Sequence, residues 1–560
     1  MKQYGNTGNT DDVKTGYPLA AWIWGHRLRV GQHWMEYLLE FLNVLAGFNY
    51  QLGQGIDQDV RCKLSNYQRF SRLGLRRFVF YDEHEKTPNI YDTAAMKRLR
   101  KELSQVTWLI NGDGSGEEPF SLAKKLLRSF SAVEDQRSWY AKSLLPVHHE
   151  MLFWEALRKG ATKAEKNIDV NAIDEASYDK NITYSDRNFF ARGGELYYLI
   201  LSAGTQSRQP IGQSIEKSIN QLLLERNTSL GTLARHIDAT WQSVVKLGEI
   251  DANTGSLGWL LDPDCALYRQ IADDVFQLLQ APLDALEMLD MLAHMIGFHL
   301  VLYIYHRAHP NSHALTHADG SCMRTCRPTL MIDLQHGDGQ QAIRNVSAAT
   351  FRDQDTMIRQ KASRYVQDQI GSRRKYDSTL IDIHDSISVQ FGFSLLRKTT
   401  RDLFTAQVEK LADSVAENTI SFDVAIQQYT DQLEKLLFND FDKNFKGVHT
   451  KLAKAIGFVA PYKGPNPRFV LSDTLLRAMT FAIIPVNQSF TFHTFLQLLY
   501  EHYGLVIGYQ EAKLAGLVER HRINSEYYQR NTTAFLEKLQ HAGLAVEYSD
   551  ATALVFGSKV

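Results

Sequence analysis

Residues 281–334 read APLDALEMLDMLAHMIGFHLVLYIYHRAHPNSHALTHADGSCMRTCRPTLMIDL, and the rest of the chain is organised around them. Leucine, isoleucine and tyrosine recur at helical spacing through the first half. Pro282 and Asp284 are residue types favoured in the first turn of a helix. The stretch therefore predicts one long apolar helix. A loop crowded with histidine and cysteine follows, and PTLMIDL at 328–334 predicts a short buried strand.

The predicted helix is apolar enough to raise the question of a membrane span. It also carries Asp284, Glu287, Asp290 and two histidines, and a span of about twenty residues rarely tolerates so many polar groups. We interpret it as a core helix and expect no membrane segment. Residues 1–18 are polar and lack the apolar run of a signal peptide, so we expect a disordered lead-in on a cytoplasmic protein.

The bulk composition limits the classes of protein to consider. A chain of 560 residues is too long for one core, so several domains are expected. The formal net charge of -1 gives no argument from the whole chain for a nucleic-acid or membrane surface. Four cysteines are too few for a disulfide scaffold, and they fit reduced thiols or one metal site better.

Amphipathic helical patterns dominate, and they predict a mainly α, multi-domain helical protein with a few short strands. RLGLRRFVFYD at 72–82 predicts one strand by its alternation. PYKGPNPR at 461–468 has three prolines and one glycine, which indicates a linker. We therefore expect an N-terminal helical domain at 19–165, a central helical domain with short strands at 180–460, and a last domain at 466–560.

The last domain has the pattern of a winged-helix-like module. Four helical segments are followed by LAVEYSDATALVFG at 544–557, which predicts a β-hairpin. Several short helices and then a hairpin is the order of a winged helix-turn-helix, in which the helix before the hairpin enters the major groove. The sequence thus predicts a C-terminal winged-helix-like domain.

The charge of this domain leaves two interpretations open. Residues 509–541 hold five basic and four acidic side chains, whereas a dedicated DNA reader normally has a clearly basic face. One interpretation is a wing that docks a protein. The other is DNA binding, for which the expected contacts are Arg520, Arg522, Arg530 and Lys538.

The loop after the predicted core helix has the ligand types of a zinc site. His313 and His317 are separated by three residues, and so are Cys322 and Cys326. Zinc prefers four such ligands in a tetrahedron, and short spacings let one loop supply them. These four residues are the candidate ligands of a structural zinc, with His309 as a substitute. The alternative is a surface loop with incidental histidines.

A second metal hypothesis is catalytic. Asp333, His336 and Asp338 lie near glycines, and carboxylates with imidazoles can hold a hydrolytic metal. The corresponding alternative function is a metal-dependent nuclease or phosphohydrolase centred on residues 306–338. The sequence contains no P-loop, no nucleophile elbow and no set of protein-kinase motifs.

Several phrases resemble accessory subunits of bacterial anti-phage defence operons, namely phosphorothioation-dependent restriction-like and related multi-gene systems. They are RNFFARGGELYYLIL, PTLMIDLQHGDGQQAIRNVSAATF, LSDTLLRAM, YGLVIG and SDATALVF. None is a catalytic motif, so the resemblance assigns no residue roles. It implies a non-catalytic scaffold or adaptor that works with a separately encoded ATPase, helicase or nuclease in a DNA-targeting complex. A stand-alone DNA-binding protein is the remaining alternative.

Overall fold

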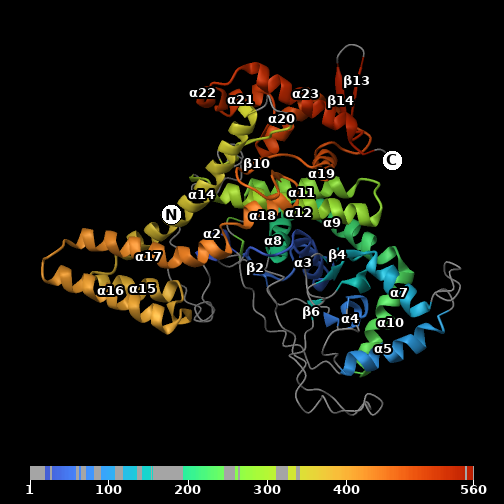
Figure 1. Ribbon diagram of the computed structural model, residues 1–560, viewed down its shortest axis with the longest axis horizontal. Coiled ribbons are helices and arrows are strands. Elements are labelled where there is room, and N and C mark those ends of the chain that lie inside the picture. Colours follow the sequence, from blue (N-terminus) through green and yellow to red (C-terminus); the bar gives the residue numbers. More distant parts are fainter. Residues whose placement is uncertain are drawn as a thin grey trace.

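The protein is mainly helical with a few short strands, as the sequence predicts (Figure 1). The structure is a computed structural model, and it describes residues 19–25, 28–57, 62–64, 71–72, 74–80, 90–106, 118–134, 142–152, 154–155, 193–244, 259–260, 262, 265–310, 326–335, 341–548 and 552–558.

The helix predicted in the quoted stretch is α12, Ala285–Ala308, and it runs through the middle of the protein (Figure 1). Its N-cap is Asp284, whose carboxyl oxygen accepts the backbone N–H groups of Leu286 and Glu287. The helix is long and apolar enough to cross a membrane, but 83% of its apolar window is buried inside the protein. Its apolar surface therefore belongs to the core, as expected.

Helices from distant parts of the sequence surround α12. They are α2 (Leu19–Trp24), α3 (Trp34–Gly47), α8 (Gly193–Thr205), α11 (Ala266–Leu279), α14 (Gln341–Arg373), α18 (Val448–Ala455) and α19 (Asp473–Ile483). The start of α8 packs so tightly on α3 that only glycine fits there. A Cβ atom on Gly193 would lie 2.2 Å from the Tyr37 ring, and one on Gly194 would lie 2.4 Å from the backbone nitrogen of Phe41.

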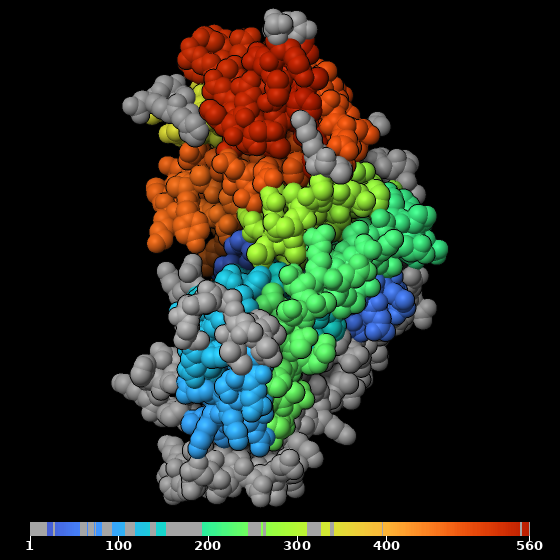
Figure 2. All heavy atoms as spheres, turned by 90° about the vertical axis from the view of Figure 1, so that its right-hand side faces the viewer, coloured from blue at the N-terminus to red at the C-terminus, as the bar shows by residue number. Residues whose placement is uncertain are grey.

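A second helical group lies at the opposite end from the C-terminus (Figure 2). Its members are α4 (Gly74–Phe80), α5 (Ile90–Leu103), α7 (Pro119–Arg128) and α10 (Thr228–Val244). The helix α9 (Gln209–Asn220), which packs on α11, and the π-helical turn η5 (Gln221–Glu225) precede α10 in the chain. The strand predicted at 72–82 is wrong at residues 74–80, which form α4, whereas Arg72 belongs to the short strand β3 (Ser71–Arg72). Leu75, Phe78 and Val79 are buried at helical spacing against this group. A short apolar run fits either structure, and here the packing partners decide.

Four helices build an arm that projects from the body (Figure 1). We define the helical arm as the second half of α14 together with α15 (Leu380–Gln390), α16 (Lys398–Ala416) and α17 (Phe422–Asn444). The short 3-10 turn η7 (Phe393–Leu395) lies between α15 and α16. The 33-residue α14 connects the arm to the body, because its first half packs on α12 and its second half packs on α15 and α17.

The C-terminal part lies at one end of the protein (Figures 1 and 2). We define the C-terminal module as α19, β11 (Ser489–Thr491), α20 (Phe492–Tyr503), β12 (Leu505–Val506), α21 (Tyr509–Leu514), α22 (Leu517–His521), α23 (Ser525–His541), β13 (Ala545–Glu547) and β14 (Ala553–Phe556). β14 lies in the centre of an antiparallel sheet, between β11 and β13. The hairpin predicted at 544–557 is therefore confirmed.

The remaining strands are short pairs that join distant segments. They are β1 (Ile56–Asp57) with β2 (Cys62–Leu64) and β7 (Trp259–Leu260), β3 (Ser71–Arg72) with β6 (Trp154–Glu155), β4 (Ser131–Val133) with β5 (Ser143–Leu144), β8 (Leu330–Met331) with β12, and β9 (Val459–Ala460) with β10 (Arg468–Phe469). The buried strand predicted in PTLMIDL is β8, which is confirmed. PYKGPNPR connects β9 to β10, and the domain boundaries expected from the sequence stay predictions.

One buried side chain fastens the C-terminal module to β8. Asn531 of α23 is fully buried, and its amide nitrogen lies 2.9 Å from the carbonyl oxygen of Ile332 and 3.0 Å from that of Ile507. Its side-chain oxygen accepts the backbone N–H of Leu334 at 3.0 Å. The module is thus joined to the body by buried hydrogen bonds as well as by α19 packing on α11 and α12.

Candidate functional site

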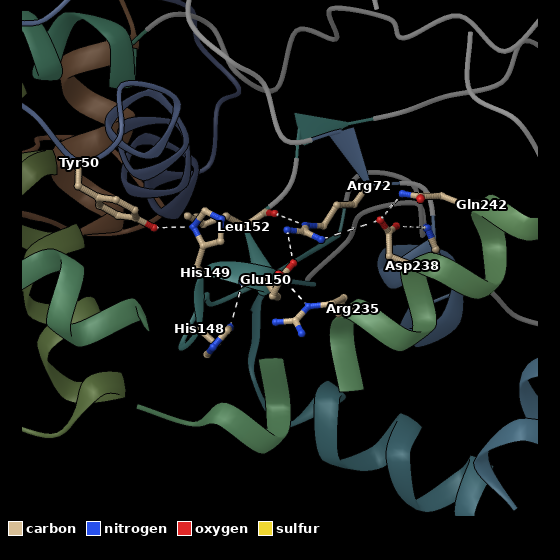
Figure 3. A network of polar contacts seen from close by, with 10 residues as sticks. Tyr50, Arg72, His148, His149, Glu150, Leu152, Arg235, Asp238 and Gln242 are labelled. Atoms are coloured by element: carbon tan, nitrogen blue, oxygen red, sulfur yellow. Dashed lines mark hydrogen bonds and ion pairs between the residues drawn. The ribbon is translucent and has the colours of Figure 1, made fainter. Parts of the chain in front are cut away.

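A network of ionisable side chains is centred on Arg72 of β3 (Figure 3). The guanidinium lies 2.5 Å from the Glu150 carboxylate and 3.9 Å from that of Asp238. Its Nε donates to the carbonyl oxygen of Leu152 at 2.8 Å. The Arg72 side chain is only 11% exposed, so a buried cation faces two carboxylates from different elements.

Glu150 is held ionised by two arginines. Arg235 of α10 lies 3.1 Å from its other oxygen. Burial alone would raise the pKa of Glu150, but the charges and hydrogen bonds of Arg72 and Arg235 outweigh it and lower that pKa below its usual range. Glu150 therefore joins the η2 turn (His149–Met151) to both β3 and α10.

Asp238 fixes the junction between β3 and α4. One of its oxygens accepts the backbone N–H of Gly74 at 3.2 Å, and the other accepts the Gln242 amide at 3.0 Å. A Cβ atom on Gly74 would lie 2.9 Å from the carbonyl oxygen of Ile237, so the start of α4 must be glycine to approach α10. The Asp238 carboxylate therefore positions the backbone at the start of α4 as well as the Arg72 side chain.

Two adjacent histidines complete the network. The Tyr50 hydroxyl lies 2.7 Å from Nδ1 of His149, and Nδ1 of His148 accepts the backbone N–H of Glu150 at 3.1 Å. Burial lowers the pKa of both imidazoles, and nearby Arg72 lowers it further, so both are neutral near pH 7. Burial raises the Tyr50 pKa, which keeps its phenol protonated. These groups are acid–base residues in type, but their visible contacts hold elements together.

The sequence contains only a weak signal for this network. His148, His149 and Glu150 are consecutive and polar, but Arg72 and Asp238 lie 78 and 88 positions from Glu150 in the printed numbering. No spacing motif links residues so far apart. The structure brings them together because β3 pairs with β6 and α10 packs on η2.

The predicted zinc ligands are only partly visible. His313, His317 and Cys322 lie outside the described residues. Cys326 is described and fully buried. Within the described ranges, no three His, Cys, Asp or Glu side chains gather as a metal site would require. The structural zinc stays a prediction.

A cationic cluster lies at the end of α12, close to Cys326. Lys361 of α14 is 3% exposed, and burial with nearby Arg307 lowers its pKa to about 7. Arg307 forms an ion pair with Asp262. His306 is buried, and neither ring nitrogen has a hydrogen-bond partner among the described residues. The cluster places an amine that titrates near neutral pH close to a buried thiol, and no sequence motif contains Lys361.

The catalytic-metal hypothesis depends on Asp333, which has other partners. This side chain is buried and lies 2.6 Å from Arg468 and 3.6 Å from Arg344. Two arginines already balance the carboxylate, so it has less charge to offer a cation. His336 and Asp338 lie outside the described residues, and that hypothesis stays a prediction.

The candidate DNA contacts lie along α22 and α23, where carboxylates face three of them. Arg520 forms two hydrogen bonds with Asp353 of α14, at 2.6 and 3.0 Å. Arg530 lies 2.5 Å from Glu526, and Lys538 pairs with Asp473. The fourth residue, Arg522, is exposed just after α22, with a φ of 50°. These pairs reduce the positive field that a phosphate backbone would meet.

The class that the described residues define is a mainly helical protein in which a central core carries a projecting arm and a C-terminal module with a three-stranded sheet. Comparisons with family models, with curated proteins and with solved structures find no match for the chain.

Proposed function

We propose that this chain is a non-catalytic scaffold or adaptor subunit that docks partner proteins through its helical arm and its C-terminal module. The resemblance of its sequence phrases places the proposal in a bacterial DNA-targeting anti-phage defence complex, with an ATPase, helicase or nuclease as the partner. The partner would then carry out catalysis, and this chain would position the components of the complex relative to one another.

The observation that carries the proposal is exposed apolar surface on the helical arm. Tyr376, Leu403 and Val389 are 77%, 68% and 59% exposed, and Ile381 and Val424 are 46% and 45% exposed. Single exposed apolar residues are ordinary, whereas several on one projecting element favour an interaction surface. The arm helices also bury their own stripe against each other, so these side chains are surplus to the arm's fold.

The C-terminal module has the same property. Leu514 is 74% exposed, and Val546 and Tyr548 of the β-hairpin are 48% and 49% exposed. Glu547 lies between the latter two and is exposed. An acidic and apolar hairpin favours a protein surface over a phosphate backbone.

The topology of the module supports a winged-helix assignment. Its helices α19, α20 and α23, its strand β11 and its terminal hairpin follow the helix-then-hairpin order of that class, and β14 lies in the middle of the sheet. Many winged helices dock proteins. The paired state of Arg520, Arg530 and Lys538 favours this use of the module.

The test is co-purification of the full-length chain with the ATPase, helicase and nuclease products of adjacent genes. We expect at least one of them to elute with the wild-type chain in stoichiometric amount. Tyr376→Ser with Leu403→Ser, or Val546→Ser with Tyr548→Ser, should lower the retained partner at least about tenfold, because interface aromatic and apolar anchors carry much of the binding energy.

The matched control is Leu224→Ser, which removes a 38% exposed leucine of η5 far from both surfaces and should retain the partner. Duplex DNA is the competing ligand in a mobility-shift assay at two salt concentrations. Tight, salt-dependent DNA binding that Arg522→Glu abolishes, without any co-purified protein, would refute the adaptor and support a stand-alone DNA binder.

A further inference from the structure

A polar groove of about 440 Å³ lies between the turn at 51–56 and the helices α8 and α9. The volume is in the range of small-ligand sites. Figure 2 shows a blue surface from the early chain beside green helices on the face it presents. None of the motifs quoted from the sequence contains a residue that lines the groove.

The turn that forms one wall is held by three anchors, the side chains of Tyr198, Ser202 and Glu216. The Tyr198 hydroxyl lies 2.7 Å from the carbonyl oxygen of Gln51 and 3.1 Å from that of Gln54. Ser202 accepts the backbone N–H of Gly53 at 3.0 Å. The preceding residue, Tyr50, is tied to the network of Figure 3 through its hydroxyl. The wall is therefore preorganised, which lowers the entropy that a ligand must overcome.

The third anchor is Glu216, the charged residue among the described residues that line the groove. Its Oε1 accepts the backbone N–H of Leu52 at 2.6 Å. Its Oε2 has no hydrogen bond from the described part of the chain and is able to accept from a ligand. The carboxylate thus has a fixed orientation with one oxygen available.

Amide side chains supply most of the remaining polar lining. Gln206, Gln209 and Gln213 follow α8 and α9 along the groove, and their side-chain amides make no hydrogen bond within the described residues. Thr205 is also part of the lining. Several planar carbonyl acceptors beside one carboxylate favour a ligand with several donors and a positive charge.

We propose that this groove binds a guanidinium group, with Glu216 as its anionic partner and the glutamine carbonyls as further acceptors. Guanidinium is planar, has five donors and is weakly hydrated, so it suits a shallow, amide-lined groove. Ammonium is compact and strongly hydrated, so it loses more on leaving water. An anion would be repelled by Glu216. The proposal goes beyond the adaptor function and does not depend on it.

The experiment is a ligand-observed NMR titration of the full-length chain with N-acetyl-arginine methylamide and N-acetyl-lysine methylamide. We expect the arginine probe to bind at least about tenfold more tightly than the lysine probe. Hydrogen exchange of the peptide that covers Leu52 and Gly53 should slow when the arginine probe is added. A third probe, ethylguanidinium, separates the sources of the group. Binding equal to that of the arginine probe indicates a free small ligand, and weaker binding indicates an arginine within a polypeptide.

Glu216→Gln keeps an oxygen for the Leu52 N–H and removes the charge, so the fold is retained. We expect it to weaken arginine-probe binding at least about tenfold, the loss typical of a charge-assisted hydrogen bond. Glu225→Gln is the matched control, because it removes one exposed carboxylate from η5 outside the groove. Equal binding of both probes, or equal weakening by both variants at unchanged melting temperatures, would overturn the proposal.

Discussion

The central helix α12 and the arm helix α16 use their apolar residues in opposite ways. Every residue from Met291 to Ala308 is buried. In α16, by contrast, the buried side chains are Phe404, Val408 and Leu411, which form one narrow stripe. α12 is enclosed on all sides by helices from the whole chain, whereas α16 packs on α15 and α17 and leaves Leu403 68% exposed.

The comparison separates a helix whose apolar residues are enclosed from one that leaves apolar residues exposed. One set of polar groups inside the core is matched by hydrogen bonds. Nε2 of His299 lies 3.1 Å from Asp274, and its Nδ1 lies 2.9 Å from the Tyr197 hydroxyl. On the arm, by contrast, several apolar side chains are exposed to solvent. We therefore expect stability to be concentrated around α12, and the proposed partner contacts to lie on the arm.

The largest expected effect is in the core. His299→Ala removes the imidazole between Asp274 and Tyr197. The buried Tyr197 hydroxyl and Oδ2 of Asp274 lose this partner, while Oδ1 of Asp274 keeps its hydrogen bond from Gln270. We expect the free energy of unfolding to fall by about 3–5 kcal/mol, the usual cost of breaking a buried pair. Urea unfolding followed by circular dichroism measures it.

The double variant His299→Leu with Asp274→Leu replaces both polar partners by apolar side chains. We expect it to recover much of the loss, because replacing a buried pair with well-packed apolar groups is often close to neutral. A loss of less than about 1 kcal/mol in the single variant would contradict the matched-core interpretation.

The next prediction compares substitutions at two neighbouring residues of the arm helix α16. Phe404 is 5% exposed and Leu403 is 68% exposed. Phe404→Ala should lower the free energy of unfolding by about 3 kcal/mol through the cavity it leaves. Leu403→Ala should change it by less than about 0.5 kcal/mol and should weaken partner co-purification instead. A large stability loss for Leu403→Ala would show that the exposed face supports the fold.

The contrast between core and arm was largely predictable from sequence periodicity. The predominantly apolar composition of 285–308 predicts a core helix, and the alternating faces of the arm predict amphipathic helices. The β8 strand and the terminal hairpin follow from local pattern in the same way. Periodicity fails at 74–80, because seven residues are too few to separate a helix from a strand before their neighbours are known.

The ionic contacts between different elements were not predictable, because they join residues far apart in the chain. The sequence counts Arg520 among the basic residues, but nothing in it pairs Arg520 with Asp353, 167 positions away. Arg72 likewise finds Glu150 and Asp238 through tertiary packing alone. Charge counts describe the sum over a segment, whereas a binding surface depends on which charges are already paired.

The smallest expected effect is at Lys361, on the helix that joins the core to the arm. Its pKa is lowered to about 7, mainly by burial, while an unfolded lysine titrates near about 10.4. Between these values the unfolded chain binds more protons, so the contribution of Lys361 to stability rises with pH and its penalty is complete below about pH 7. Lys361→Met should therefore stabilise the chain by about 1–3 kcal/mol at pH 6.

The gain from Lys361→Met should shrink as the pH rises from 7 to 10, and urea unfolding at pH 6 and pH 9 measures the difference. Lys451→Met is the control, because Lys451 is exposed on α18 and its replacement should have an effect below about 0.5 kcal/mol at both values. A gain that does not change with pH would mean that Lys361 stays charged in the folded chain. The Lys361 amine would then be hydrated at the base of the arm. The tightly packed core would in that case end nearer to α12.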